Sequence, residues 1–382
     1  RQFFSPPAGP QPGIYHTRPK TEDETPYRLH LRLEKSGAGV LVLNASTVLH
    51  LNQTAAEYAY HLIQGTPVEE MVRLVTRRYR TSAEEVRQDY QDLAERIHAL
   101  ASMNDLDPVI FYDLDLQEPY SGETSAPLRL DCALTYKTGD DNQAASPLQR
   151  ARRELTGEEW KSILDKAWQF GIPHVIFTGG EPTLRPDLPE LVAHAQGLGQ
   201  VSGLLTSGLR LTETDYLHSL LDAGLDHILL ALDVNSPPAW EALRDVLAED
   251  VFVAVHLTIN RQNYTHLAET IQKLAEMKVP AISLSTGDPV LKPDMRQARQ
   301  LAAELGMRLV WDLPVPYSST NPVNLEIAEV ETPPQGAGKT WFYVEPDGDL
   351  LPGQGILHVL GNLTEDPWEK LYPLGLHWQE NK

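Results

Sequence analysis

The stretch ELTGEEWKSILDKAWQFGIPHVIFTGGEPTLRPDLPELVAHA, residues 154–195, decides the fold class of this chain. It predicts a helix, a buried strand, a glycine turn and a second helix. Thr156 and Glu159 can exchange hydrogen bonds as a capping box at the start of the first helix, and Gly171 ends that helix. HVIF is a short apolar run of the kind found in strands buried on both faces. The stretch therefore predicts one unit of an α/β fold.

The same strand–helix alternation repeats from Leu128 to Asp312, with units of about 25–30 residues. Such a series builds either a barrel or an open doubly wound sheet. In both architectures the functional site lies beyond the carboxyl ends of the strands. Strands are predicted at 128–137, 174–178, 201–206, 227–233, 251–258, 280–285 and 308–312, and helices at about 156–170, 187–198, 212–223, 238–248, 264–277 and 293–305.

The turn Thr178–Pro182 is the strongest candidate for a site. Gly179 and Gly180 at a strand end let the backbone approach a ligand closely, and Glu181 can accept hydrogen bonds from a cationic amine. An ordinary strand-to-helix turn explains the same residues. Polar residues that follow the other strands are further candidates for the rim of this site, although loops are polar in general. They are Thr206, Ser207, Asp233, Asn235, Thr258, Asn260, Ser285 and Asp312.

Two other features carry less chemistry. His256, inside the apolar run VFVAVHLTI, is interpreted as a hydrogen-bonded core or barrel-lining histidine rather than a ligand. No grouping of His, Asp and Glu has a spacing typical of a metal site. GAGKT at 336–340 is not a P-loop, because Pro333 stands where that motif needs glycine.

The flanking regions differ from the α/β series. Residues 1–25 are rich in Pro and are expected to be a mobile arm. Residues 26–101 predict three short strands and three helices, a winged-helix-like module, and residues 102–126 predict a linker. After a Pro-rich loop, residues 314–382 predict a hairpin around Pro346-Asp347-Gly348 and a short helix near 367–372.

Composition excludes several classes of protein. The 53 acidic residues exceed the 32 basic ones by 21, which argues against nucleic acid or an anionic membrane as the main partner. The single cysteine excludes a disulfide framework and the usual thiolate-held zinc or iron–sulfur site within this chain. There is no apolar run of membrane-spanning length and no secretory signal at the start, so the expected location is the cytosol.

From Leu128 to about Asp312 the chain resembles the radical S-adenosylmethionine (SAM) enzymes, in particular the peptide-modifying branch with the PqqE-type maturases. GGEP after the second strand, LLTSGLRLT and HILLALDVNS follow that family's order of motifs. The resemblance implies a partial (β/α)6 barrel of the TIM type. It also implies a SAM-type pocket formed by Gly179, Gly180, Glu181, Pro182, Thr206, Ser207 and Asp233.

Both flanks add to this resemblance. VLVLNASTVLHLNQTAAEYAYHLIQGTPVEEMV resembles PqqD-like domains, which bind the leader of a ribosomally made precursor peptide. This implies a leader peptide that adds a strand at an exposed sheet edge, expected near residues 27–43. FYVEPDGDLLPG and GNLTEDPWEKLY resemble the SPASM/twitch extension, which normally carries auxiliary clusters.

The departure from the family lies in the cluster ligands. The family's C-x3-C-x2-C loop, which binds a [4Fe–4S] cluster, corresponds here to Thr138, Asn142 and Ala145, and Gly353 stands at an auxiliary cluster position. Cys132 lies inside a strand, where a small buried hydrophobe is expected. Ala231 replaces a serine common in the family. Thr, Asn and Ala cannot replace three thiolates on iron, so neither a [4Fe–4S] cluster nor reductive cleavage of SAM is expected.

Three interpretations stay open. The first is a pseudoenzyme that binds a precursor peptide leader, an active radical SAM maturase, or both. The second is a protein that keeps residual SAM or small-molecule binding and performs non-radical chemistry or sensing. The third is a DNA-binding regulator, which rests only on Arg73, Arg77, Arg78 and Arg80 and is opposed by the net charge.

Overall fold

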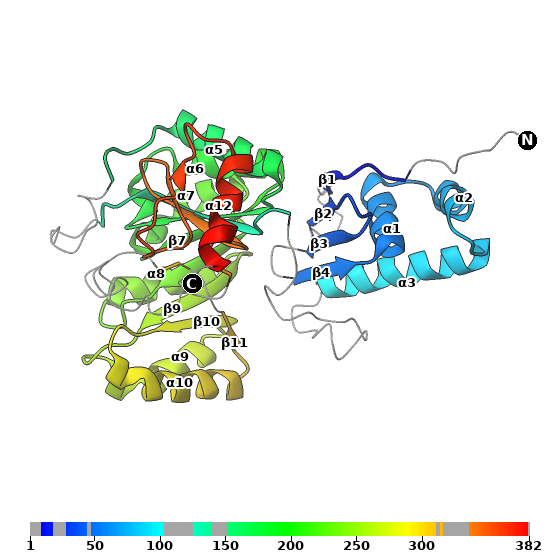
Figure 1. Ribbon diagram of the computed structural model, residues 1–382. Helices are drawn as coiled ribbons and strands as arrows, with labels where there is room; N and C mark the ends of the chain where they lie inside the picture. Colours follow the sequence, from blue (N-terminus) through cyan, green and yellow to red (C-terminus); the bar gives the residue numbers. More distant parts are fainter. Residues whose placement is uncertain are drawn as a thin grey trace, which may run out of the picture. The chain divides into compact units, whose positions relative to one another are not determined.

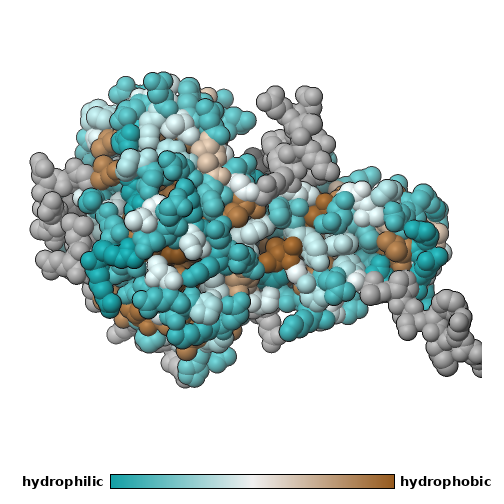
Figure 2. Space-filling view, turned by 90° about the horizontal axis from the view of Figure 1, so that it is seen from above, coloured by the Kyte–Doolittle hydropathy of each residue, from teal (hydrophilic) through white to brown (hydrophobic). Residues whose placement is uncertain are grey.

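The computed structural model describes residues 9–17, 28–43, 47–102, 125–138, 151–310, 314–315 and 336–380. The chain divides into two compact units, residues 1–125 and 126–382, and each is described by itself (Figure 1). None of the described helices combines the length and the apolar character needed to cross a bilayer. On the face drawn in Figure 2, hydrophobic residues form small separate groups among hydrophilic ones.

Unit 1 packs helices against one face of a four-stranded antiparallel sheet in the order β1-β2-β3-β4. The sequence predicted the last three strands and all three helices. Their bounds are β1 (Gly13–His16), β2 (Leu29–Leu33), β3 (Gly39–Leu43), β4 (Thr47–Leu51), α1 (Gln53–Gln64), α2 (Val68–Arg78) and α3 (Ala83–Ser102).

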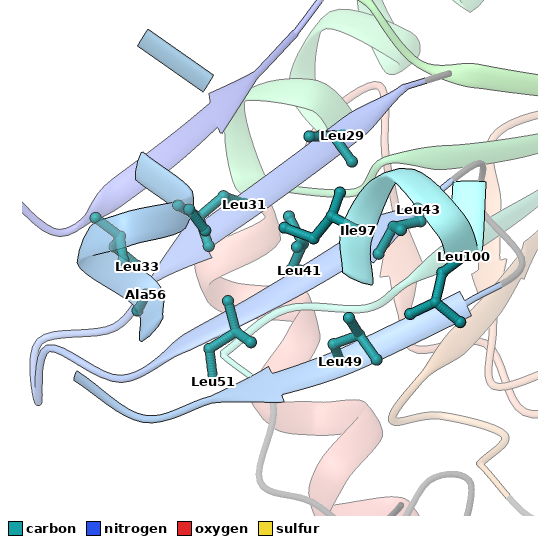
Figure 3. Packing of buried hydrophobic residues seen from close by; sticks show 11 residues of the cluster. Leu29, Leu31, Leu33, Leu41, Leu43, Leu49, Leu51, Ala56, Ile97 and Leu100 are labelled. Atoms are coloured by element: carbon teal, nitrogen blue, oxygen red, sulfur yellow. The ribbon is translucent and has the colours of Figure 1, made fainter. Parts of the chain in front are cut away.

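Leucines at alternate positions build the core of unit 1. Because side chains alternate between the two faces of a strand, every second residue of β2, β3 and β4 points the same way. Figure 3 shows these leucines on one side of the sheet, toward α1 and α3. The cluster contains Leu29, Leu31, Leu33, Leu41, Leu43, Leu49, Leu51, Ala56, Ile97 and Leu100.

Strand β1 shows that two predictions were wrong, the mobile arm over residues 13–16 and the exposed sheet edge near residues 27–43. Residues 13–16 lie in the predicted mobile arm, yet they pair with residues 30–33 of β2, and Tyr15 packs edge-on against Tyr60 with ring centroids 4.8 Å apart. β1 therefore covers the outer edge of β2, and β3 lies between β2 and β4. The exposed edge that was expected near residues 27–43 is not there. Strand pairing across Gly13–His16 could not be foreseen because the segment is short and rich in Pro.

Unit 2 is built on a sheet in the order β11-β10-β9-β8-β7-β6-β5-β12-β13-β14. Seven neighbouring strands are parallel and follow each other in sequence order. A doubly wound sheet needs this order to reverse, so the structure selects the barrel-like alternative. The seven strands are β5 (Arg129–Thr135), β6 (His174–Gly179), β7 (Val201–Thr206), β8 (His227–Ala231), β9 (Phe252–Thr258), β10 (Ala281–Ser285) and β11 (Arg308–Leu309).

Six of the described α-helices connect these strands, and α10 packs beside β10 and β11 (Figure 1). The predicted capping box of Thr156 and Glu159 is present, and Gly171 ends the first helix in a left-handed conformation. The helices are α5 (Gly157–Phe170), α6 (Leu188–Leu198), α7 (Thr214–Asp222), α8 (Pro237–Leu247), α9 (Leu267–Glu276) and α10 (Lys292–Glu304).

The C-terminal part extends the same sheet. The predicted hairpin is present as β12 (Trp341–Val344) and β13 (Asp349–Leu351), and β14 (Gly361–Asn362) follows. β12 lies parallel to β5, a long-range pairing that no local pattern encodes. Helix α12 (Trp368–Glu380) is longer than the helix predicted at 367–372, because it continues through Pro373.

Candidate functional site

The glycine turn after β6 packs against the end of β5. Gly179 has a φ of +127°, and a Cβ on it would lie 2.1 Å from the Thr135 carbonyl oxygen. A Cβ on Gly180 would lie 2.3 Å from the Lys137 carbonyl oxygen. The amides of Gly180 and Glu181 donate to these same two carbonyls, at 2.8 and 2.7 Å. Both glycines are therefore required by a close approach within the chain itself.

The carboxylate of Glu181 links the turn after β6 to the end of β7 through hydrogen bonds with Thr183, Thr206 and Ser207, and we call this group the Glu181 clamp. Its side chain is only 6% exposed. Oε1 accepts from the amide and hydroxyl of Thr183 and from the Thr206 hydroxyl, at 3.1, 2.6 and 2.6 Å. Oε2 accepts from the amide and hydroxyl of Ser207, at 2.8 and 2.6 Å. Five donors meet a group with about four lone-pair sites, so a ligand amine would have to displace one of them.

The structure brings together most of the residues predicted for the SAM-type pocket. Thr206 and Ser207 meet Glu181, and Pro182, itself buried, begins the 3-10 turn η3 (Pro182–Leu184). Thr183 belongs to the same group, although no sequence pattern indicates it. Asp233 is exposed and accepts from the Asn235 amide at 3.0 Å, and none of its described contacts reaches the clamp.

The cluster positions do not supply ligands for iron. Thr138 offers a hydroxyl, while Asn142 and Ala145 lie outside the described residues. Cys132 is fully buried in β5, and burial together with the neighbouring Asp131 raises the pKa of its thiol well above the usual value. An iron–sulfur cluster binds thiolates, so this thiol does not fit one. Gly353 is buried after β13 and offers no side chain.

A pocket of 320 Å³ lies beside the glycine turn, and no pattern in the sequence indicates it. Glu154 on its wall accepts from the Thr135 hydroxyl at 2.5 Å and from Lys137 Nζ at 3.3 Å. Arg185 forms two hydrogen bonds with Asp187, at 2.9 and 2.6 Å. The lining thus carries charges of both signs, contributed by segments far apart in the sequence: Thr135, Lys137, Glu154, Leu184, Arg185, Pro186 and Asp187.

His256 is the hydrogen-bonded histidine that the sequence predicted. Its Nδ1 lies 3.1 Å from the Ser283 hydroxyl, and its Nε2 lies 3.2 and 2.9 Å from the hydroxyls of Thr258 and Ser285. Burial lowers the pKa of His256 to about 4, so the ring is neutral at pH 7. Thr258 and Ser285, two predicted rim residues, thus meet at this imidazole.

Three carboxylates gather on the hairpin, although the sequence shows no grouping with a spacing typical of a metal site. Ligand oxygens of Glu345, Asp347 and Asp349 lie within 4.8 Å of one another. Protein donors face each of them, since the Tyr136 hydroxyl donates to Glu345, the Arg152 amide to Asp347 and the Asn362 amide to Asp349, all at 2.9 Å. Alternate residues of a hairpin share a face, which explains the grouping.

Two of the four arginines behind the DNA-binding interpretation are paired with carboxylates. Arg78 pairs with the buried Glu57 of α1, and Arg73 pairs with Glu70 at 3.6 Å. The Arg78 pair is buried, whereas Arg73 stays 60% exposed in its pair.

Comparison with known proteins agrees with the fold. Residues 132–296 match the radical SAM superfamily. PqqA peptide cyclase of Streptomyces rochei is 34% identical over 156 residues, which cover 37% of this chain and 43% of the relative. PqqA peptide cyclase of Rhizobium meliloti is 31% identical over 236 residues, 54% of this chain and 60% of the relative. The chain thus spans less than two thirds of the length of these relatives.

Two solved structures have a similar fold. Streptococcus suis SuiB bound to S-adenosylmethionine superposes with a TM-score of 0.60 at 16% identity, over 95% of this chain and 90% of SuiB. SuiB bound to the precursor peptide SuiA gives 0.60 at 15% identity, over 91% and 88%. At these identities the likeness concerns the fold alone. The likeness to radical SAM proteins in sequence therefore concerns the domain of residues 132–296.

The hydrogen bonds of the Glu181 carboxylate predict that Glu181→Gln strongly destabilises the fold. The amide would turn a donor toward hydroxyls and amides that now donate, and the charge that strengthens these hydrogen bonds would be lost. We expect the free energy of unfolding to fall by about 3 kcal/mol in urea titrations. The control is Glu213→Gln, an exposed carboxylate in a surface pair with Arg210, for which a change below about 0.5 kcal/mol is expected. Equal effects of the two substitutions would contradict the clamp.

His256 predicts a pH dependence of stability. Its pKa is about 4 in the folded chain and about 6.5 when unfolded, so the unfolded chain binds the extra proton between these values. The stabilisation is complete above pH 6.5 and is lost as the pH falls toward 4. We expect the unfolding free energy to drop by about 3 kcal/mol more in the parent chain than in His256→Asn over this range. Parallel curves for the two proteins would disprove this assignment, and His218→Asn, an exposed histidine, serves as the control.

Proposed function

We propose that this chain is a catalytically silent radical SAM-like protein, a pseudoenzyme, that binds a ribosomal precursor peptide, an active maturase partner, or both. The observation that carries the proposal is the set of side chains at the cluster positions. Reductive cleavage of SAM needs an electron from a cluster held by three thiolates. This chain offers the Thr138 hydroxyl at the first position and one cysteine, Cys132, whose thiol is buried in β5.

The glycine turn supports the retention of the barrel without its cofactors. Gly180, Glu181 and their partners satisfy each other through backbone and side-chain hydrogen bonds. A fold whose site-forming loops are held by internal contacts keeps its shape when the cluster ligands are replaced. Such a barrel can serve as a binding scaffold.

Unit 1 supplies the proposed peptide site. Within the described part of the chain, β4 pairs with β3 on one side only, so its other edge presents unpaired backbone groups. Leu49 and Leu51 anchor this strand in the core, which holds the edge rigid. An extended leader peptide can add to β4 as a further strand by main-chain hydrogen bonds. The fold neighbour SuiB, bound to the precursor peptide SuiA, supports a peptide as the ligand class.

Hydrogen exchange on the full chain tests the peptide site. The probes are overlapping synthetic 20-residue peptides that cover PqqA, SuiA and short precursors encoded beside this chain. We expect a binding peptide to slow exchange of the amides in Thr47–Leu51. The opposite edge of the same sheet, Gly13–His16, is the internal control and should not change. Absence of protection for every peptide, or protection at Gly13–His16 alone, would remove the proposed site.

Anaerobic reconstitution with iron and sulfide tests whether this chain can hold a catalytic iron–sulfur cluster. We expect no cluster absorbance near about 400 nm for the parent chain. A variant with Thr138→Cys, Asn142→Cys and Ala145→Cys restores three thiolates at the family's spacing and is the matched positive control. A cluster band with SAM cleavage in the parent chain would overturn the proposal.

One observation favours the alternative function, which is the binding of SAM or another small molecule with non-radical chemistry or sensing. The 320 Å³ pocket beside the glycine turn is lined by charges of both signs, which suits a zwitterionic ligand. Calorimetry of the full chain with SAM separates the two functions, because heat of binding is expected only for the alternative.

A further inference from the structure

Two histidines meet at the amino end of the parallel sheet of unit 2. His174 is the first residue of β6 and His227 is the first residue of β8, and β7 lies between the two strands. Their Nε2 atoms are 3.3 Å apart, and both residues are half-buried. Because β6 runs from His174 to the glycine turn at Gly179, the pair stands about 16 Å from that turn, at the opposite end of the sheet.

A glycine in the strand between them lets the two rings meet. Gly203 of β7 is the cross-strand neighbour of His227, and Val201 of β7 is the neighbour of His174. A Cβ on Gly203 would lie 2.2 Å from Nε2 and 2.7 Å from Cε1 of His227. The imidazole of His227 therefore lies directly over the backbone of β7, in the space that a side chain at position 203 would fill.

The histidine pair stands on the same face of the sheet as a hydrophobic cluster. Side chains alternate along a strand, so His174 points to the side of Ile176, and His227 points to the side of Leu229. Ile176 and Leu229 both belong to one buried hydrophobic cluster. Polar rings beside an apolar core cost free energy unless their nitrogens are engaged. Here one Nε2 donates its proton and the other accepts it, so each ring engages the other.

The geometry of the pair matches that of two ligands of one metal ion. Imidazole nitrogens bind Zn²⁺ at about 2.0–2.1 Å, so two of them on a tetrahedral ion are about 3.3 Å apart. This is the separation of the two Nε2 atoms. In a straight N–H···N hydrogen bond with this separation, the ring centroids would be about 5.6 Å apart. The centroids of His174 and His227 are 5.0 Å apart and the ring planes meet at 60°, so the rings are inclined to the line between their nitrogens.

The charges around the pair favour coordination by neutral nitrogen over attraction by charge. Burial and the positive charge of Arg129 lower the pKa of His227 to about 4, so its ring is neutral at pH 7 and keeps a lone pair for a metal. Asp131 balances Arg129 through two hydrogen bonds, at 2.8 and 3.1 Å. On the other side, Arg308 lies over the ring of Phe252, the cross-strand neighbour of His227. A hydrated cation gains little here, whereas a transition-metal ion is held by the nitrogens themselves.

We infer that His174 and His227 are a chelating pair for a divalent transition-metal ion of the zinc type, which links β6 to β8 across β7. The inference is independent of the proposed peptide-binding function. Imidazole suits zinc, copper and nickel, whereas magnesium and calcium prefer oxygen ligands. Among the described residues, the one group of three or more metal-binding side chains lies on the hairpin, so water completes the coordination of an ion held by this pair. In the bound state the lone pair of each Nε2 points at the ion, and each ring keeps its proton on Nδ1.

Calorimetry with zinc chloride tests the pair on the full chain after removal of metal with EDTA. We expect His174→Asn and His227→Asn each to weaken zinc binding at least tenfold, because a single imidazole cannot chelate. Gly203→Ala should weaken it as well, since the added Cβ displaces the ring of His227. The controls are His194→Asn and His218→Asn, whose rings pair with surface carboxylates at 2.8 and 3.1 Å, and both should bind zinc at this site like the parent chain.

A second measurement locates the ion without any substitution. Anomalous diffraction at the zinc edge, on crystals of the parent chain grown with zinc, should give a peak about 2.1 Å from both Nε2 atoms. Circular dichroism checks the folding of each variant, and where a substitution unfolds the chain this peak decides.

Several results would overturn the inference and leave His174 and His227 as a hydrogen-bonded pair. They are no zinc binding by the parent chain, binding that persists unchanged in folded His174→Asn and His227→Asn, an equal loss in the two surface controls, and an anomalous peak only at other residues. None of these results bears on peptide protection at β4 or on the cluster positions, so this site and the proposed function can fail separately.

Discussion

The carboxyl end of the barrel depends on one buried carboxylate. Glu181 collects two backbone amides and three hydroxyls from the turn after β6 and the end of β7. Its own amide holds the Lys137 carbonyl at the end of β5, so three neighbouring strands are fixed relative to one another. A buried carboxylate is costly unless donors satisfy it, and here the donors exceed its lone-pair sites. The glycines at 179 and 180 are needed because the two backbones approach too closely for any side chain.

This clamp connects the fold to the proposed function. Its partners all lie within the chain, so internal contacts organise this end of the sheet. The polar groups that the family resemblance assigns to a ligand are engaged with each other, whereas β4, within the described residues, pairs with β3 on one side only. An open strand edge is one of the surfaces to which an extended peptide can add.

Regular elements were predictable because they rest on local periodicity. The strand HVIF and the helix between Thr156 and Gly171 follow from short-range patterns, and the structure has them within a residue or two. β1 was missed because a proline-rich segment has no period of its own and acquires a strand only by pairing with β2. The parallel placement of β12 beside β5 was missed for the same reason, since about 200 residues separate the two strands and no local signal records their contact.

The single cysteine and the residues at the cluster positions are properties of the sequence alone, because thiolate chemistry depends on the type of side chain and no fold can supply a missing sulfur. The sequence also identified Glu181, Thr206 and Ser207 as members of one site. Only the tertiary structure decided what they do there, since a carboxylate is free or occupied according to the donors that surround it in space.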